Sequence, residues 1–206
     1  MRIPRTSTMK KNLLAIWILM ASVGPGLAQP APEGFPAAPA ATRDPELLQI
    51  DGVKDAALLT KRIEAVRKWL PMEFRKRNNF AWAVAKIDGL DKVEYFAHSG
   101  IQDFDGLSSD AQKRIAEISL KPAKGRFKTL CVNQRGVVEG DDCWQRNVDT
   151  EYKILEDMAS RLPDTSVSGR MRLYTELYPC PSCWNVMKQF LAVYTNIQMQ
   201  VLYRKP

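Results

Sequence analysis

Histidine is nearly absent from the sequence, and this restricts the metal sites that the chain can build. One His and four Cys occur among 206 residues. Sites made of several imidazoles are therefore excluded, and a bound metal would have to use thiolates and carboxylates. Hydrophobic residues make up 45% of the chain and charged residues 26%. This balance excludes disordered, collagen-like and coiled-coil chains, and the length suits one ordinary domain.

No apolar run in the sequence is long enough for a comfortable membrane span. A shorter run near the N-terminus predicts a secretory signal peptide over residues 1–28. It spans 13–23, about 11 residues, whereas a membrane span needs roughly 20. Four basic residues precede it, and the sequence Gly-Leu-Ala at 26–28 supplies the small residues that a signal peptidase needs. An uncleaved anchor is the alternative. We expect cleavage, and with it a secreted or periplasmic protein that has no membrane attachment.

The charge of the chain depends on this cleavage. The full sequence has 30 basic and 23 acidic residues, a formal charge of +7. Without residues 1–28 the basic residues fall to 26 and the charge to +3. What remains is concentrated in residues 61–78 and 121–135, which are either solvated surface or a track for a phosphate backbone.

Periodicity after residue 52 predicts an α/β layer with a mixed sheet. Residues 29–52 are rich in Pro and Ala at first and predict a flexible leader, so the folded domain is expected over 53–206. Apolar spacing and turn residues place the elements along the chain. Helices are expected at 59–70, 108–118, 152–162 and 181–193, and strands at 80–85, 93–98, 127–132, 171–175 and 197–203.

Cys180 and Cys183 form the strongest local motif, Pro-Cys-Pro-Ser-Cys, at a strand-to-helix junction. A C-x-x-C pair at a helix start can be a redox dithiol, two zinc ligands or a short disulfide. Only 23 residues follow Cys183, too few for the strands and helices that a thioredoxin-like fold places after its motif. The redox interpretation is therefore disfavoured.

Asp149, Thr150 and Glu151 open the preceding helix, where an Asp is also a good N-cap and a Glu suits the helix dipole. Together with the P-C-x-x-C motif, however, they have the layout of the zinc deaminases, H-x-E…P-C-x-x-C. In that chemistry three protein ligands hold zinc, the metal acidifies a water molecule, and a non-ligand Glu carries its proton to the leaving amine.

These motifs resemble the cytidine deaminase-like superfamily, and specifically its secreted bacterial toxin deaminases. The resemblance covers about residues 55–206. It rests on the stretches 96–100 (FAHSG), 146–155 (RNVDTEYKIL) and 174–183 (YTELYPCPSC), followed by Gln189-Phe190. It implies a three-layer sandwich with a mixed central sheet, a Zn²⁺ cofactor, and a nucleic acid or nucleotide substrate. A toxin would also be expected to have an immunity protein as partner.

The resemblance also implies roles for individual residues. Asp149, Cys180 and Cys183 would hold zinc, and Glu151 would be the general acid and base. Thr175 would shape the wall of the substrate pocket, and Asn79 would contact the base or sugar, although by default it is a turn residue. His98 and Ser99 end the second strand. His98 is by default a core or edge residue bonded to the backbone, and the resemblance implies that both residues contact substrate.

The chain departs from the family pattern in two ways. Asp149 stands where most deaminases have His or Cys, so two thiolates and a carboxylate would give zinc a formal net charge of −1. The usual fifth strand is missing after residue 203, and 127–132 is the candidate to replace it.

Cys131 and Cys143 lie 12 residues apart across a loop. In an exported protein they are expected to form a disulfide. The alternative is a four-Cys structural zinc site with Cys180 and Cys183, which would make the chain an exported binding module without catalysis. The prediction is nonetheless a zinc-dependent nucleobase deaminase.

Overall fold

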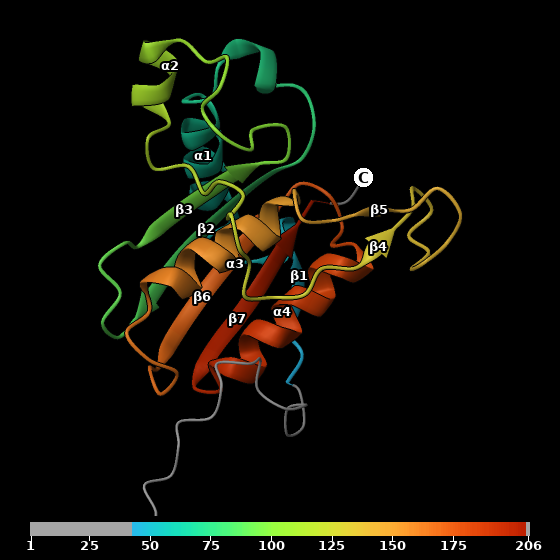
Figure 1. The fold of residues 1–206 in the computed structure, drawn as a ribbon. Helices are drawn as coiled ribbons and strands as arrows, with labels where there is room; N and C mark the ends of the chain where they lie inside the picture. Colours follow the sequence, from blue (N-terminus) through green and yellow to red (C-terminus); the bar gives the residue numbers. More distant parts are fainter. Residues whose placement is uncertain (1–42, 205–206) are drawn as a thin grey trace, which may run out of the picture. The chain divides into compact units, whose positions relative to one another are not determined.

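The computed structural model describes residues 43–204, and these form a mixed sheet of five strands with helices on both faces (Figure 1). The predicted signal peptide at 1–28, and the leader as far as residue 42, lie outside the described residues. The strand order is β1-β7-β6-β2-β3, with β1, β7 and β6 parallel and β2 antiparallel to both of its neighbours. The strands are β1 (Glu46–Gln49), β2 (Phe80–Ile87), β3 (Glu94–His98), β6 (Gly169–Thr175) and β7 (Ile197–Tyr203).

Four α-helices accompany the sheet, together with a separate two-stranded sheet. The helices are α1 (Ala56–Arg67), α2 (Ser109–Arg114), α3 (Thr150–Arg161) and α4 (Pro181–Val193), and the small sheet pairs β4 (Cys131–Val132) with β5 (Trp144–Gln145). The 3-10 turns η1 (Ile50–Gly52) and η2 (Met72–Phe74) flank α1. No helix within residues 43–204 is long and apolar enough to cross a membrane.

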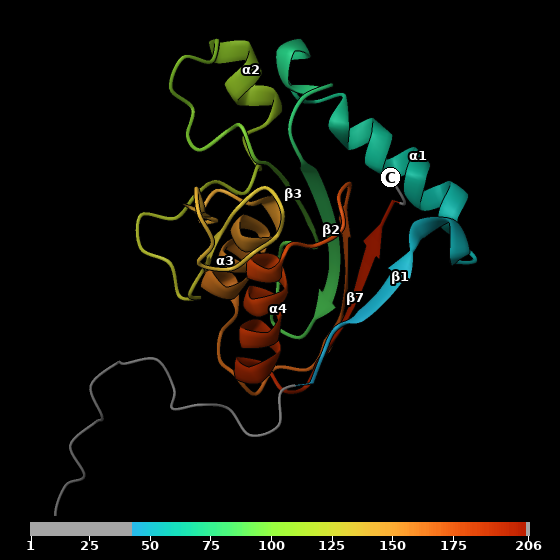
Figure 2. The ribbon, with the colours of Figure 1, turned by 90° about the vertical axis from the view of Figure 1, so that its right-hand side faces the viewer.

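Alternation along β2 divides the molecule into layers. Its alanines, Ala81, Ala83 and Ala85, face one core, which α3 and α4 cover, and their small side chains leave room for two helices. Phe80 and Trp82 point to the opposite face and pack in a second core with α1. Figure 2 shows α3 and α4 on one side of the sheet and α1 on the other. The predicted three-layer sandwich of the cytidine deaminase-like kind is confirmed.

The fifth strand of the sheet comes from the segment predicted as a flexible leader. Glu46 to Gln49 form β1, which pairs in parallel with Gln200 to Tyr203 of β7. Leu47 and Leu48 pack against the two cores from their edges, and Ile50 is fully buried. The leader boundary at residue 52 is therefore wrong, because apolar side chains in 47–50 complete both cores.

Residues 127–132 do not supply the fifth strand that was expected of them. Only Cys131 and Val132 are in a strand, and they pair with Trp144 and Gln145 outside the main sheet. The segment before them runs across α3 and α4, whose side chains bind its backbone amides (Figure 1). Side chains thus take the place of a neighbouring strand.

Candidate metal centre and active site

Three side chains converge where α3 and α4 begin. Asp149 directly precedes α3, Cys180 directly precedes α4, and Cys183 lies in the first turn of α4. The two sulfur atoms are 3.1 Å apart, and Oδ2 of Asp149 lies 3.3 Å from Sγ of Cys180 and 3.2 Å from Sγ of Cys183. They form a group of three ligand atoms that could hold one metal ion.

The backbone explains why these side chains are free to meet. Asp149 occupies the N-cap position with extended dihedral angles, yet its side chain makes no capping hydrogen bond. The carboxylate turns instead toward the sulfur atoms, so capping does not account for Asp149. Pro181 opens α4, and the backbone amide of Cys183 donates to Sγ of Cys180, which fixes the loop that carries both sulfurs.

This donor set fits zinc. Ligands at about 2.0–2.3 Å from a tetrahedral zinc lie roughly 3.3–3.8 Å from one another, so a small outward shift of the three atoms would admit the ion. Two thiolates and one carboxylate supply three of four positions. The remaining position would be open to water, as in catalytic rather than structural zinc sites.

Glu151 lies beside the three-atom group with only 2% of its surface exposed. Burial, and then the charge of Asp149, raise the pKa of its carboxyl group. The hydroxyl group of Thr150 donates to Oε2 of Glu151 at 2.8 Å, and the Asn79 side-chain amide donates to Oγ1 of Thr150 at 2.8 Å. Asn79 and Thr150 therefore hold the Glu151 carboxylate in one orientation.

A cavity of about 160 Å³ opens onto these groups. Asn79, Ser99 and Glu151 line it together with the three candidate ligands. Oδ1 of Asn79 is one of three buried side-chain polar atoms within 43–204 that lack a hydrogen-bond partner. A larger cavity of about 800 Å³, between α1 and the exposed part of the sheet, contains none of these groups.

A family model of toxin deaminases, the BURPS668_1122 family of deaminases, matches residues 63–205, which include all of the groups just described. The chain belongs to this family. Membership confirms the predicted resemblance to toxin deaminases of the cytidine deaminase-like kind, and it identifies the chain as a hydrolytic deaminase. No curated protein and no solved structure shows significant similarity to the chain.

The structure places His98 in the core, as the default interpretation had it, and not in the substrate contact that the resemblance implied. The side chain is fully buried, away from the cavity lining, and packs edge-on against Phe74. Nε2 donates to the carbonyl oxygen of Arg77 at 2.8 Å, and Nδ1 accepts from the amide of Gly100 at 3.2 Å. Both ring nitrogens are thus occupied, and burial lowers the pKa of the imidazole, so that His98 is a neutral core residue.

Thr175 and Ser99 differ in their access to the cavity. Thr175 is fully buried behind its wall, where Oγ1 accepts a hydrogen bond from Nδ2 of Asn79 at 3.0 Å. It therefore supports Asn79 from behind the wall and does not itself line the cavity. Ser99 does line the cavity, and its Oγ accepts from the backbone amide of Asn79 at 3.0 Å.

Lys153 supports this wall of the cavity, and sequence reasoning did not predict this role. Its side chain is fully buried, and Nζ donates to the carbonyl oxygens of His98 and Ile101 at 2.9 and 2.6 Å. These bonds tie the loop that carries Ser99 to α3. Burial lowers the pKa of Lys153 to about 7. A lone Lys among the apolar positions of α3 was the only available signal.

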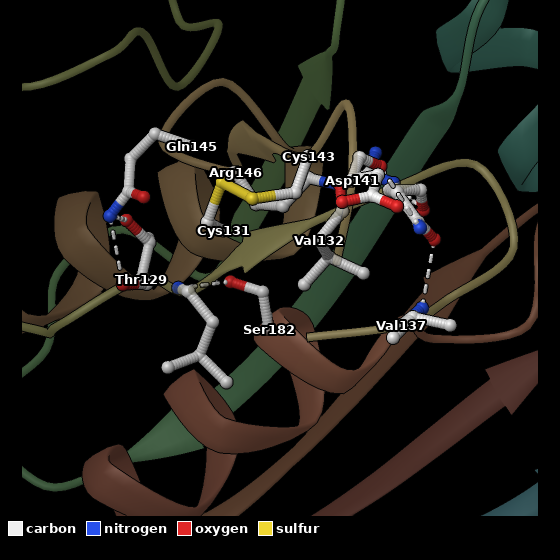
Figure 3. The surroundings of a disulfide bond; sticks show 11 residues. Thr129, Cys131, Val132, Val137, Asp141, Cys143, Gln145, Arg146 and Ser182 are labelled. Atoms are coloured by element: carbon white, nitrogen blue, oxygen red, sulfur yellow. Dashed lines mark hydrogen bonds between the residues drawn. A yellow bond between two sulfur atoms is a disulfide. The ribbon is translucent and has the colours of Figure 1, made fainter. Parts of the chain in front are cut away.

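Cys131 and Cys143 form a disulfide in the structure (Figure 3). It closes the loop between β4 and β5. Oγ of Ser182, between the two candidate ligand cysteines, accepts a hydrogen bond from the amide of Leu130 at 2.9 Å. Since Cys131 and Cys143 bind each other, the four-Cys zinc site considered as an alternative is not formed.

Proposed function

We propose that the chain is a zinc-dependent deaminase that acts on a nucleobase within a nucleic acid or a nucleotide. The observation that carries this proposal is the triangle of Asp149 Oδ2 and the two sulfur atoms, with edges of 3.1 to 3.3 Å, beside a buried carboxyl group in a cavity. A binding module would not need Glu151 to be buried there without an ion-pair partner among residues 43–204.

The reaction replaces the amino group on a ring carbon by oxygen from water and releases ammonia. Zinc, when bound, would acidify the attacking water. Glu151 takes a proton from this water and delivers it to the departing nitrogen, which balances the exchange. Its raised pKa suits both halves of this transfer, because the carboxyl group must accept and then release a proton near neutral pH.

Other residues of the cavity orient the base. Oδ1 of Asn79 can accept from a donor group of the substrate, since its own amide group is fixed by Thr150 and Thr175. Tyr178 also lines the cavity and is 60% exposed. Exposed aromatic rings stack on bases, so Tyr178 is the candidate platform for a nucleotide next to the reacting one.

A redox function for Cys180 and Cys183 has less support. The hydrogen bond with Cys180, and then burial, raise the pKa of the Cys183 thiol well above its ordinary value. A reactive dithiol needs surroundings that stabilise the attacking thiolate, whereas the carboxylate of Asp149 lies beside both sulfur atoms and opposes a negative charge on them. A cation at this position would instead favour both thiolates.

Export is part of the proposal. A disulfide persists in an oxidising compartment, which agrees with the signal peptide predicted over 1–28 and with a secreted or periplasmic protein. Within the toxin deaminase family, the natural partner of such a chain would be an immunity protein that blocks the cavity.

The proposal is tested with purified residues 29–206. We expect about one zinc ion per chain. Single- and double-stranded DNA, RNA and free nucleosides are each incubated with the protein, and ammonia and the altered base are measured. Glu151→Gln should lower the rate at least about 100-fold and retain zinc. A wild-type chain without zinc, or a fully active Gln variant, would refute the proposal.

A further inference from the structure

Arg146 faces the side of Asp149 that points away from the sulfur atoms. Nη1 of Arg146 lies 3.9 Å from Oδ1 of Asp149, whereas Oδ2 contacts Cys180 and Cys183. Among the described residues this is the only ion pair that Asp149 makes. The side chains of Arg146 and Asp149 are 17% and 14% exposed, so solvent screens the pair only in part.

The segment closed by the disulfide holds the Arg146 side chain in this position. Nε donates to the carbonyl oxygen of Val132 and Nη2 to that of Asn133, both at 3.2 Å. On its other side the guanidinium group lies 4.0 Å from the ring centre of Trp144. Figure 3 shows Arg146 beside the bond between Cys131 and Cys143.

From this arrangement we infer that Arg146 is a positioning residue for the proposed zinc ligand Asp149, and that the disulfide-closed segment 131–143 holds Arg146 in place. The inference rests on the proposed function. Two thiolates and a carboxylate bring three negative charges to a divalent ion, and the fixed charge of Arg146 makes the group neutral. Partners behind metal ligands orient the ligand atoms, and their loss typically lowers metal affinity 10- to 100-fold.

Zinc affinity is the quantity that tests this inference. It is measured by competition with a chromophoric chelator on the metal-free protein. Arg146→Gln should weaken zinc binding about tenfold. Arg146→Lys keeps the charge but loses the fork that binds Val132 and Asn133, and should fall between Gln and wild type. Arg135→Gln is the matched control, because Arg135 lies exposed in the same loop and takes part in no ion pair within 43–204.

The same Arg146 substitution made in an Asp149→His variant distinguishes positioning of Asp149 from general support of the loop. Asp149→His supplies zinc with a neutral ligand that has no use for a cation behind it. In that background Arg146→Gln should change zinc affinity less than about twofold, whereas a purely structural loss would weaken binding equally in both backgrounds. An equal loss in both would overturn the inference.

The disulfide is tested with Cys131→Ser and Cys143→Ser combined. Zinc affinity should fall by about threefold to tenfold, since Arg146 keeps its charge but loses its fixed position. Wild-type affinity in this variant would overturn the role of the disulfide, and wild-type affinity in Arg146→Gln would overturn the whole inference. If the wild-type chain itself binds no zinc, the proposed function fails together with the inference.

Discussion

Glu151 is the residue at which stability and the proposed catalysis oppose each other. An ordinary Glu has a pKa near 4.3, and burial raises the pKa of Glu151 in the folded chain. Above the ordinary pKa the folded state therefore binds more protons than the unfolded state, and stability falls as pH rises through this range. A buried carboxyl group with a raised pKa costs stability at neutral pH, which supports the catalytic role proposed for Glu151.

Glu151→Gln should accordingly stabilise the metal-free protein at pH 7 to 8. The amide removes the buried charge and keeps the shape, and each kcal/mol recovered should raise the Tm by about 2–4 °C in a domain of this size. The gain should shrink as pH approaches 4, where Glu151 is protonated in both states. Thermal unfolding of the two proteins between pH 4 and 8 measures this, and a gain that is independent of pH would contradict it.

Sequence reasoning could predict those site residues whose relative positions are set by their spacing at the start of a single helix. Cys180 and Cys183 start a helix three residues apart, and Asp149 and Glu151 flank the start of another. Which way a side chain points after a strand ends is decided by tertiary contacts. For this reason His98, at the end of β3, turned out to bind backbone groups in the core.

Arg146 could not have been assigned from the sequence for the same reason. Its partners are the carbonyl oxygens of Val132 and Asn133, which lie 14 and 13 residues away and come close only when the disulfide loop forms. Proximity to Asp149 in the sequence was the only available signal, and an Arg three residues before an N-cap residue is not by itself informative.

At the scale of elements, the stretch before β4 shows how a helix side chain can replace a strand. Oε1 of Glu156, in α3, accepts from the backbone amides of Arg126 and Phe127, each at 2.7 Å. Gln189, in α4, accepts from the amide of Lys128 at 2.8 Å. The apolar residues at 127–132 suggested a strand. A sequence pattern does not show whether a neighbouring strand or a helix side chain binds the backbone, so the prediction could not distinguish the two.

Glu156→Ala should therefore loosen this segment selectively. The buried amide of Phe127 and the partly buried amide of Arg126 would lose their acceptor, so the free energy of unfolding should fall by about 2 kcal/mol. Hydrogen exchange at the amides of Arg126 and Phe127 should become faster. The amides of β6, at the centre of the sheet, should remain among the slowest to exchange, as in the wild type. Unchanged exchange at both residues would show that another group supports the segment.

β1 lies in the segment that was predicted to be a flexible leader, and its removal should destabilise the domain. A chain that begins at Arg43 keeps β1, whereas one that begins at Val53 exposes the edge of β7 and deletes Ile50, which is fully buried. The loss of Ile50, Leu47 and Leu48 should lower the free energy of unfolding by at least about 3 kcal/mol. Urea unfolding of both chains measures the difference, and equal stabilities would mean that β1 is not part of the folded unit.

For the molecule as a whole, the two basic segments differ in how many of their side chains are bound by other groups of the protein. In 61–78, Arg62 pairs with Glu94, and Arg67 pairs with Glu176. Arg75 binds the carbonyl oxygens of Lys68 and Leu70. In 121–135, by contrast, the basic side chains take part in none of the ion pairs within 43–204. This second segment crosses α3 and α4 toward the cavity. At its end the backbone amide of Leu130 donates a hydrogen bond to Ser182, which lies between the two candidate ligand cysteines.

Binding of a single-stranded nucleic acid should therefore depend on residues 121–135 and on salt. The exposed residues Lys121, Lys124 and Lys128, changed together to Ala, should weaken binding and lower the slope of log affinity against log salt by about 2, since each phosphate contact on a single strand contributes about 0.7. Helix α1 lies on the face of the sheet opposite α3 and α4 (Figure 2). A matched triple variant of Lys61, Lys68 and Lys76 removes the same charge from α1 and the segment that follows it, and should leave the slope near the wild-type value. Fluorescence anisotropy with a labelled oligonucleotide at several salt concentrations measures both. Equal slopes for the two variants would show that net charge alone attracts the strand, and a free nucleotide would then become the better substrate candidate.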